Sequence, residues 1–368
     1  MNFFLKKKSY NIFNLLVIGL IFTISVIFTV VLDKYFPYFF QHKLDKQNYY
    51  DSLYGNSNTG CSTIEYVDPE IVFIGDSTGY HSWDFNLFEK KTKKRIGACF
   101  LQGFSILSSE HLINFLQKKN IKPKFIILSN SYRIFLNKKI NEGFAEQHKK
   151  YLNEIENSKY QKNFQIISKY VRGKKLFEVT IPVNKEINIF LDNVETNKIN
   201  SIVKNIILQN KEASGYKNYK SLKQKFNDKN FYFEQHEKDL IFFCNFVLNN
   251  KIKLIFANVP ISKTIENLVH KKKNENDIRI FNYLKKCTNN QVYFNDYLHN
   301  YDLNNKYFML TNNKKNNYLK FKEYILNPND KKYDPGYFDF SHMNRYGSEI
   351  FTKAWLEKNY SLFKIENK

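Results

Sequence analysis

The fold of this chain is decided by the stretch IVFIGDSTGYH at residues 71–81. Four apolar residues, Ile71–Ile74, run directly into Gly75-Asp76-Ser77, which is the pattern of a buried strand that stops at a small residue. A serine held at the carboxyl end of a strand is one way to build a nucleophile. The same residues also fit an ordinary strand followed by an ordinary polar turn. The remainder of the chain has to separate these two interpretations.

Short apolar runs alternate with longer amphipathic stretches after residue 70. We expect strands at Ile71–Ile74, Ile96–Leu101, Phe125–Leu128, Leu254–Ala257 and Val292–Phe294. We expect helices at Leu107–Lys118, Phe233–Leu248 and Asn344–Lys358. Such alternation predicts an α/β fold with a mainly parallel sheet and helices on both faces. Residues 133–230, rich in Lys and Asn, are too long for a simple crossover and are expected to form an inserted helical subdomain or lid.

The N-terminal region contains a candidate membrane anchor. Residues 11–32 carry no charge and are long enough to cross a bilayer as a helix, and Lys6–Lys8 before them favour a cytoplasmic N-terminus. The alternative is a cleaved signal peptide, but the run is longer than a usual signal core and no Ala-x-Ala-like site follows it. We therefore expect an uncleaved signal-anchor. The expected parts are a cytoplasmic tip and transmembrane helix at 1–32, a stalk or linker at 33–67, and an extracytoplasmic domain at 68–368.

The chain is strongly basic, with a formal net charge of +22, which raises the question of nucleic acid or an anionic membrane as a partner. The lysines are scattered among Asn, Tyr, Ile and Phe along the whole length, and runs such as Lys271–Lys273 fit solvated helix faces. Because nucleic-acid sites are usually clustered basic stripes, we expect no nucleic-acid partner. Attraction to anionic lipid or to an anionic polymer stays open.

The cysteines give no sign of a metal site. They lack the paired short spacing of structural zinc sites and lie at Cys61, Cys99, Cys244 and Cys287. We expect neither a metal nor a cofactor. In an exported domain one disulfide is possible, and the spacing leaves its partners open. Cys99 lies in an apolar run and is interpreted as a small core residue.

A second polar motif near the C-terminus bears on the role of Ser77. The stretch FDFSHMNRYG at 338–347 places Asp339 and His342 three residues apart, just before an expected helix. A serine nucleophile needs a base such as histidine, and the histidine needs a carboxylate to hold its tautomer. The alternatives are a turn serine at 77 and a helix-start or surface histidine at 342. Two nearby polar residues have simpler interpretations, as a loop or first-turn residue for His81 and as a helix cap for Asn344.

Taken together, the two motifs resemble the SGNH, or GDSL-like, hydrolase superfamily, over about residues 70–358. Its first block matches Gly75-Asp76-Ser77, and its last block, Asp-x-x-His, matches Asp339–His342. The resemblance implies a flavodoxin-like parallel sheet and a triad of Ser77, His342 and Asp339. It also implies an oxyanion site formed by the Gly103 backbone and the Asn130 side chain. The third block of the family usually reads Gly-x-Asn-Asp, and the stretch LSNS at 128–131 keeps only its asparagine.

An anchored, outward-facing domain of this kind resembles proteins that acylate cell-surface polysaccharides such as alginate, peptidoglycan or teichoic acid. The resemblance implies a serine acyl-enzyme at Ser77, an acyl donor, a polysaccharide acceptor, and in several families a separate multi-spanning membrane acyltransferase as partner. Two alternatives stay open. One is ester hydrolysis that removes acyl groups from a surface glycan or lipid. The other is a non-catalytic scaffold or glycan-binding protein on the same fold, which the incomplete third block favours.

Overall fold

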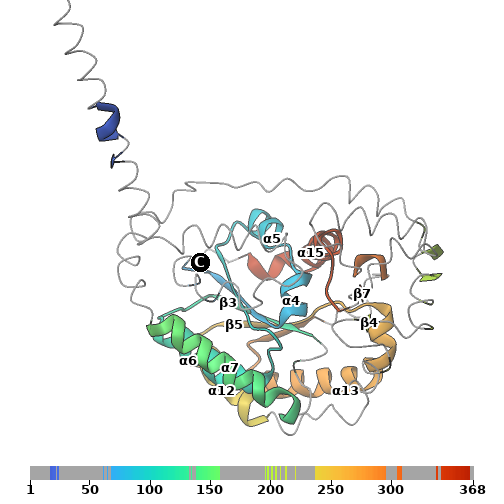
Figure 1. Cartoon of the computed structure of the whole chain (residues 1–368). Coiled ribbons are helices and arrows are strands. Elements are labelled where there is room, and N and C mark those ends of the chain that lie inside the picture. The colour runs from blue at the N-terminus through green and yellow to red at the C-terminus, as the bar shows by residue number, and fades with distance from the viewer. Residues whose placement is uncertain are drawn as a thin grey trace, which may run out of the picture.

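The computed structural model of the chain contains a five-stranded parallel sheet with the strand order β2-β1-β3-β5-β6 (Figure 1). The strands are β1 (Ile71–Gly75), β2 (Ile96–Phe100), β3 (Phe125–Asn130), β5 (Lys253–Asn258) and β6 (Val292–Asn295). Each lies where the apolar runs predict it. Counted along the chain within this sheet, the order is 2-1-3-4-5, that of a doubly wound α/β sheet. The predicted α/β fold with a parallel sheet is confirmed.

The structure describes residues 68–131, 138–157, 237–295 and 341–364, together with short pieces between 17 and 24, at 61, 64 and 134, between 195 and 220, at 305–308 and at 337–338. Most of residues 11–32, on which the expected anchor falls, lie outside this part. Within the described residues no helix is both long enough and apolar enough to traverse a bilayer.

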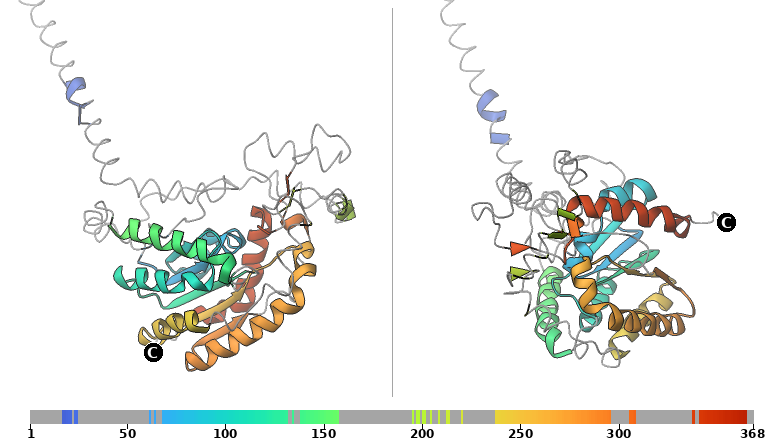
Figure 2. Two further views of the ribbon diagram at one scale, coloured as in Figure 1. Left: turned by 60° about the horizontal axis from the view of Figure 1, so that its bottom comes forward. Right: turned by 90° about the vertical axis from the view of Figure 1, so that its right-hand side faces the viewer.

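Helices cover both faces of the sheet. Successive residues of a strand point to opposite sides, so each apolar strand has side chains to bury on both faces. In β1, Ile71 and Phe73 belong to one buried cluster, whereas Val72 and Ile74 belong to the other. Figure 2 shows the red α15 and the orange α13 on opposite sides of the strands. The first face carries α4 (Ser77–Ser82), α5 (Phe85–Thr92), α15 (Arg345–Asn359) and η4 (Tyr360–Phe363). The second carries η1 (Ile106–Ser108), α6 (Ser109–Lys118), α7 (Lys138–Asn157), α12 (Glu237–Asn249) and α13 (Lys263–Cys287).

Two glycines allow α4 to pack closely against the sheet. A Cβ on Gly79 would lie 2.7 Å from Ser129 Cβ, and a Cβ on Gly75 would lie 2.9 Å from the Ser129 carbonyl oxygen. Trp83, which ends α4, donates its indole N–H to Ser129 Oγ at 2.9 Å and is fully buried. Its ring packs edge-on against Trp355 of α15. These contacts therefore fix the position of α4 relative to β3.

The loop before α15 is fixed by its cap. Asn344 Oδ1 accepts the Gly347 backbone N–H at 2.8 Å, so the expected helix cap is confirmed. The Asn344 amide also donates to the Lys306 carbonyl at 2.7 Å, in η3 (Asn305–Tyr307). These contacts hold the segment that carries His342 against a second loop.

Two disulfides join distant segments, Cys61 to Cys99 and Cys244 to Cys287. Cys99 is buried in the core, as expected, and its sulfur is also bonded to Cys61. Cys61 and Ile64 are 1% exposed although both lie in the predicted linker at 33–67. These two residues therefore belong to the packed domain, and Cys61 is tied covalently to β2.

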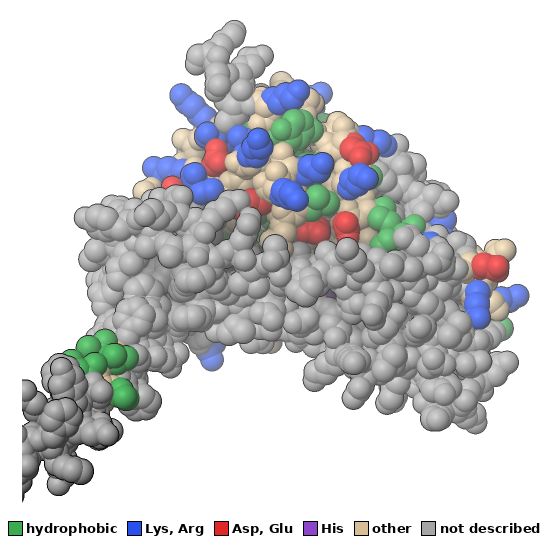
Figure 3. Space-filling view, turned by 90° about the horizontal axis from the view of Figure 1, so that it is seen from above, with side chains coloured by type: hydrophobic (Ala, Val, Ile, Leu, Met, Phe, Trp, Pro, Cys, Tyr) green, Lys and Arg blue, Asp and Glu red, His purple; other side chains and the backbone are tan. Residues whose placement is uncertain are grey.

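The predicted insertion at 133–230 begins inside the core. Its first helix, α7, packs on α6 and η1 and buries Leu152 and Ile155 in the second cluster. Farther along, β4 (Glu212–Ala213) pairs in parallel with β7 (Tyr337–Phe338). Most of residues 158–236 lie outside the described part, so the expectation of a helical subdomain or lid there stays a prediction. On the face in Figure 3, basic side chains are spread over the described surface with acidic ones among them.

Candidate active site

Ser77 and His342 come together at the carboxyl end of β1. Ser77 is the first residue of α4, and its Oγ lies 2.8 Å from His342 Nε2 although the two residues are 265 positions apart. This distance is within the hydrogen-bonding range that a nucleophile and its base require. A neutral His342 accepts the Ser77 proton on Nε2 when Nδ1 carries the ring proton. Both residues are half-buried, so a substrate can reach them.

His342 is flanked by further polar groups. Ser341 Oγ lies 3.4 Å from Nδ1, too far for a strong hydrogen bond, and the His81 ring packs edge-on against the His342 ring at 4.8 Å between centroids. His81 follows Ser77 by four residues on α4, so it falls on the same helix face. Its interpretation as an ordinary first-turn or loop residue misses this contact, which the i, i+4 spacing signals. Asp339, the expected third member of the triad, lies outside the described residues.

Asp76, the residue before Ser77, stabilises the start of α4. Its fully buried carboxylate accepts the Gly79 backbone N–H at 3.1 Å and the Ser131 hydroxyl at 2.7 Å. It thereby caps α4 and ties the start of that helix to the end of β3. The middle residue of Gly-Asp-Ser therefore positions the serine beside it.

Asn130 lies at the carboxyl end of β3, as predicted, and is fully buried. Its amide nitrogen donates to Asn258 Oδ1 and, at 2.8 Å, to Asp277 Oδ1, so both amide hydrogens are committed. Its own Oδ1 has no donor among the described residues. In this arrangement the Asn130 side chain has no hydrogen left for an oxyanion.

Sequence reasoning missed both partners of Asn130. Asn258 directly follows the expected strand Leu254–Ala257, so the rule that polar residues gather at the carboxyl ends of parallel strands could have found it. Asp277 lies within the long helix α13 and carried no local signal.

Gly103, the other expected oxyanion residue, lies in the turn that follows β2. Its φ of +63° is a left-handed conformation that glycine adopts without strain. A Cβ there would also lie 3.1 Å from the Phe144 ring of α7. The preceding carbonyl, that of Gln102, accepts a hydrogen bond from His148 Nε2 at 2.8 Å. Phe144 and His148, one turn apart on α7, therefore hold this turn at the same edge of the sheet as Ser77.

His148 forms a second serine–histidine pair, deep in the core. Its Nδ1 lies 2.7 Å from Ser108 Oγ, and both side chains are at most 2% exposed. Burial lowers the pKa of His148 to about 4. The hydrogen bond to the Gln102 carbonyl acts in the opposite direction, and the charge of His111 adds a smaller lowering. Because the Gln102 carbonyl can only accept, Nε2 carries the proton and Ser108 donates to Nδ1.

Within the described part of the chain, no group of three His, Cys, Asp or Glu side chains is arranged to hold a metal ion. Comparison with protein-family models and with curated proteins found no match to this chain.

Proposed function

We propose that this chain is a serine acyltransferase that modifies a cell-surface polysaccharide, with Ser77 as nucleophile and His342 as general base. The observation that carries the proposal is the 2.8 Å contact between Ser77 Oγ and His342 Nε2. It joins two motifs from opposite ends of the domain at the sheet edge where doubly wound proteins bind ligands. Both motifs resemble those of SGNH hydrolases.

In the proposed reaction, Ser77 Oγ attacks the carbonyl carbon of an acyl donor while His342 Nε2 takes the hydroxyl proton. The tetrahedral intermediate collapses as His342 returns that proton to the leaving oxygen, which gives the acyl-enzyme. A sugar hydroxyl then attacks in the same way and regenerates free Ser77. Asp339 is the proposed carboxylate on Nδ1, and the Gly103 backbone N–H is the proposed oxyanion donor.

The two disulfides support an extracytoplasmic site of action, because disulfides persist mainly in oxidising compartments. Together with the uncharged run at 11–32, they favour a membrane-anchored enzyme that faces the cell envelope. An acyl donor, a surface polysaccharide and a multi-spanning membrane acyltransferase are its proposed partners.

One observation favours a different function. Both amide hydrogens of Asn130 are held by Asn258 and Asp277, so the expected side-chain oxyanion donor is engaged elsewhere. Losing one such donor costs an enzyme about 3–4 kcal/mol of transition-state stabilisation. This favours the second candidate, a non-catalytic scaffold or glycan-binding protein on the same fold. Ester hydrolysis is the third candidate, since it uses the same acyl-enzyme with water as acceptor.

A fluorophosphonate probe tests these candidates on the full-length chain in a neutral detergent. An enzyme is labelled at Ser77, and Ser77→Ala abolishes the labelling. A matched serine variant, Ser108→Ala, retains it. A scaffold shows no labelling in the folded wild type.

For a labelled protein, an activated acetyl ester is supplied with and without a polysaccharide acceptor. Transfer predicts acetylated glycan and a higher rate of donor consumption when the glycan is present. Hydrolysis predicts free acetate at a rate independent of glycan.

A further inference from the structure

A groove of about 730 Å³ opens at the amino ends of β3, β5 and β6. Phe125 and Lys253, the first residues of β3 and β5, are register partners and both line it. Ser77 follows the carboxyl end of β1, and each strand of five or six residues rises roughly 3.3 Å per residue. The groove therefore lies at the opposite edge of the sheet, roughly 15–20 Å or more from Ser77.

The groove is lined by five lysines from three separate parts of the chain. They are Lys122, Lys124, Lys251, Lys253 and Lys364. Among the described residues that line it there is no aspartate, glutamate or arginine. The three parts are far apart in the sequence, so their positive charges come together only in the folded chain.

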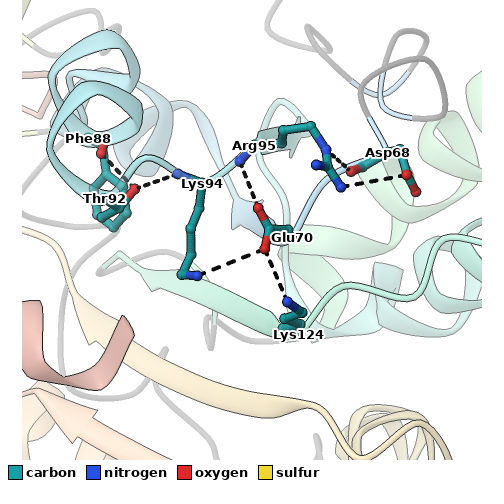
Figure 4. A network of polar contacts seen from close by, with 7 residues as sticks. All are labelled: Asp68, Glu70, Phe88, Thr92, Lys94, Arg95 and Lys124. Atoms are coloured by element: carbon teal, nitrogen blue, oxygen red, sulfur yellow. Dashed lines mark hydrogen bonds and ion pairs between the residues drawn. The ribbon is translucent and has the colours of Figure 1, made fainter. Parts of the chain in front are cut away.

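One lysine of the groove is compensated by an acid just outside it. Glu70 lies 3.2 Å from the Lys124 ammonium and 3.8 Å from that of Lys94, and it also accepts the Arg95 backbone N–H (Figure 4). Partial burial alone would raise the pKa of Glu70, but these hydrogen bonds and charges bring the pKa below its ordinary value. Glu70 is therefore an anion that neutralises Lys124.

The other four ammonium groups make no ion pair with a described residue. Lys253 and Lys364 lie over the rings of Phe125 and Tyr360, at 5.8 and 5.7 Å from the centroids. Like charges around one concave surface repel one another and focus a positive potential within it. An anionic ligand removes this repulsion, and lysine recognises it as a point charge without the planar fork of arginine.

We propose that this groove binds a linear glycan that carries carboxylate or phosphate groups. A groove fits a chain, whereas a bilayer presents a flat surface to which protruding lysines would suffice. Tyr293 lines the groove and is 38% exposed, so its ring offers an apolar face to a sugar. The volume lies within the usual range for ligand sites. The disulfides favour a compartment that holds glycans rather than nucleic acid.

This site stands whether or not Ser77 is catalytic, because it shares no residue with the Ser77–His342 pair. Binding is measured by fluorescence anisotropy on the full-length chain in neutral detergent. The probe is a labelled oligogalacturonate of about ten sugars, and a neutral maltodextrin of equal length is its uncharged control. The test variant replaces one lysine from each segment, Lys122→Gln, Lys253→Gln and Lys364→Gln. The matched control replaces three exposed helix lysines outside the groove, Lys149→Gln, Lys150→Gln and Lys238→Gln.

The groove variant is expected to bind the probe about tenfold or more weakly and with a shallower dependence on salt, because fewer counterions are released. The control variant loses the same three charges as the groove variant but none from the groove, so it should stay within about twofold of the wild type. Tyr293→Ala should weaken binding without changing the salt slope. Equal losses in the two triple variants would overturn the proposal, as would tight binding of maltodextrin. Stronger groove-dependent binding to oligothymidylate or to phosphatidylglycerol vesicles would also overturn it, because each would identify another class of partner.

Discussion

The molecule contains two serine–histidine pairs with nearly the same contact distance, 2.8 Å for Ser77–His342 and 2.7 Å for Ser108–His148. The first joins α4 to the loop before α15 and is half-buried. The second joins η1 to α7 and is sealed in the core. In the first pair the histidine uses Nε2, and in the second it uses Nδ1 while Nε2 is held by a backbone carbonyl.

This comparison shows that a serine–histidine hydrogen bond does not by itself make a nucleophile. A general base works best when its pKa lies near the working pH, and burial lowers the pKa of His148 to about 4. Ser108 is fully buried, so a substrate cannot reach it. The difference in environment is why we propose the Ser77 pair, and not the Ser108 pair, as the catalytic one.

The largest expected effect separates the two serines by activity. Ser77→Ala should lower the rate of ester turnover by about four orders of magnitude or more, because the nucleophile and base act as one unit. Ser108→Ala should leave the rate within about fivefold and cost roughly 1–2 kcal/mol of unfolding free energy, because His148 Nδ1 loses its buried donor. Rates with an activated ester, together with urea unfolding of both variants, measure this. Comparable loss of activity in both would mean that Ser108 also serves the reaction.

The second effect is the part of the pH dependence of the unfolding free energy that is due to His148. Its pKa is about 4 in the folded protein against 6.5 for the ordinary group, so the unfolded state binds the proton more readily. Its contribution is therefore full above pH 6.5 and is lost as the pH falls from 6.5 towards 4. At about 1.4 kcal/mol per pKa unit the loss approaches roughly 3 kcal/mol.

The matched variant is His148→Gln, whose amide can still donate to the Gln102 carbonyl but does not titrate. Urea unfolding of both proteins is measured at intervals between pH 7 and pH 4. The wild type should lose about 3 kcal/mol more than the variant over this range. Parallel curves would show that His148 is not buried in its neutral form.

The sequence predicts the sheet well because each strand is an uninterrupted apolar run. It predicts the Ser77–His342 contact because the two motifs resemble the first and last blocks of one hydrolase superfamily, and Ser77 follows a strand at the sheet edge where such folds bind ligands. It could not predict Asp277, whose contact with Asn130 depends on how α13 docks. The sequence also left the pairing of Cys61 with Cys99 undetermined, because it depends on two distant segments coming together in the fold. The lysine groove was hidden because its residues meet only in the folded chain.

A third and smaller effect concerns how α4 holds Ser77. Gly79→Ala puts a Cβ 2.7 Å from Ser129 Cβ and 3.0 Å from Phe100 Cε1, so α4 has to move away from the sheet. Such overpacking costs about 1–3 kcal/mol, and the shift should slow labelling of Ser77 by a fluorophosphonate. Unfolding free energies and labelling rates measure the two effects. Wild-type values for both would show that the neighbouring strand yields freely.

The smallest expected effect is the same substitution in the helix that carries His148. Gly143 lies on the exposed side of α7, with no atom within 4 Å of where its Cβ would be. Since alanine loses less backbone entropy than glycine on entering a helix, Gly143→Ala should stabilise the domain by about 0.4–1 kcal/mol. Urea unfolding should detect this gain, with Ser77 labelling unchanged. A loss of stability would mean that this side of α7 is covered by another part of the chain. A Cβ on Gly79 would meet packed atoms, and a Cβ on Gly143 would meet none. Opposite changes in unfolding free energy for the two Gly→Ala variants would therefore show that α4 is held by tight packing and α7 by its buried face alone.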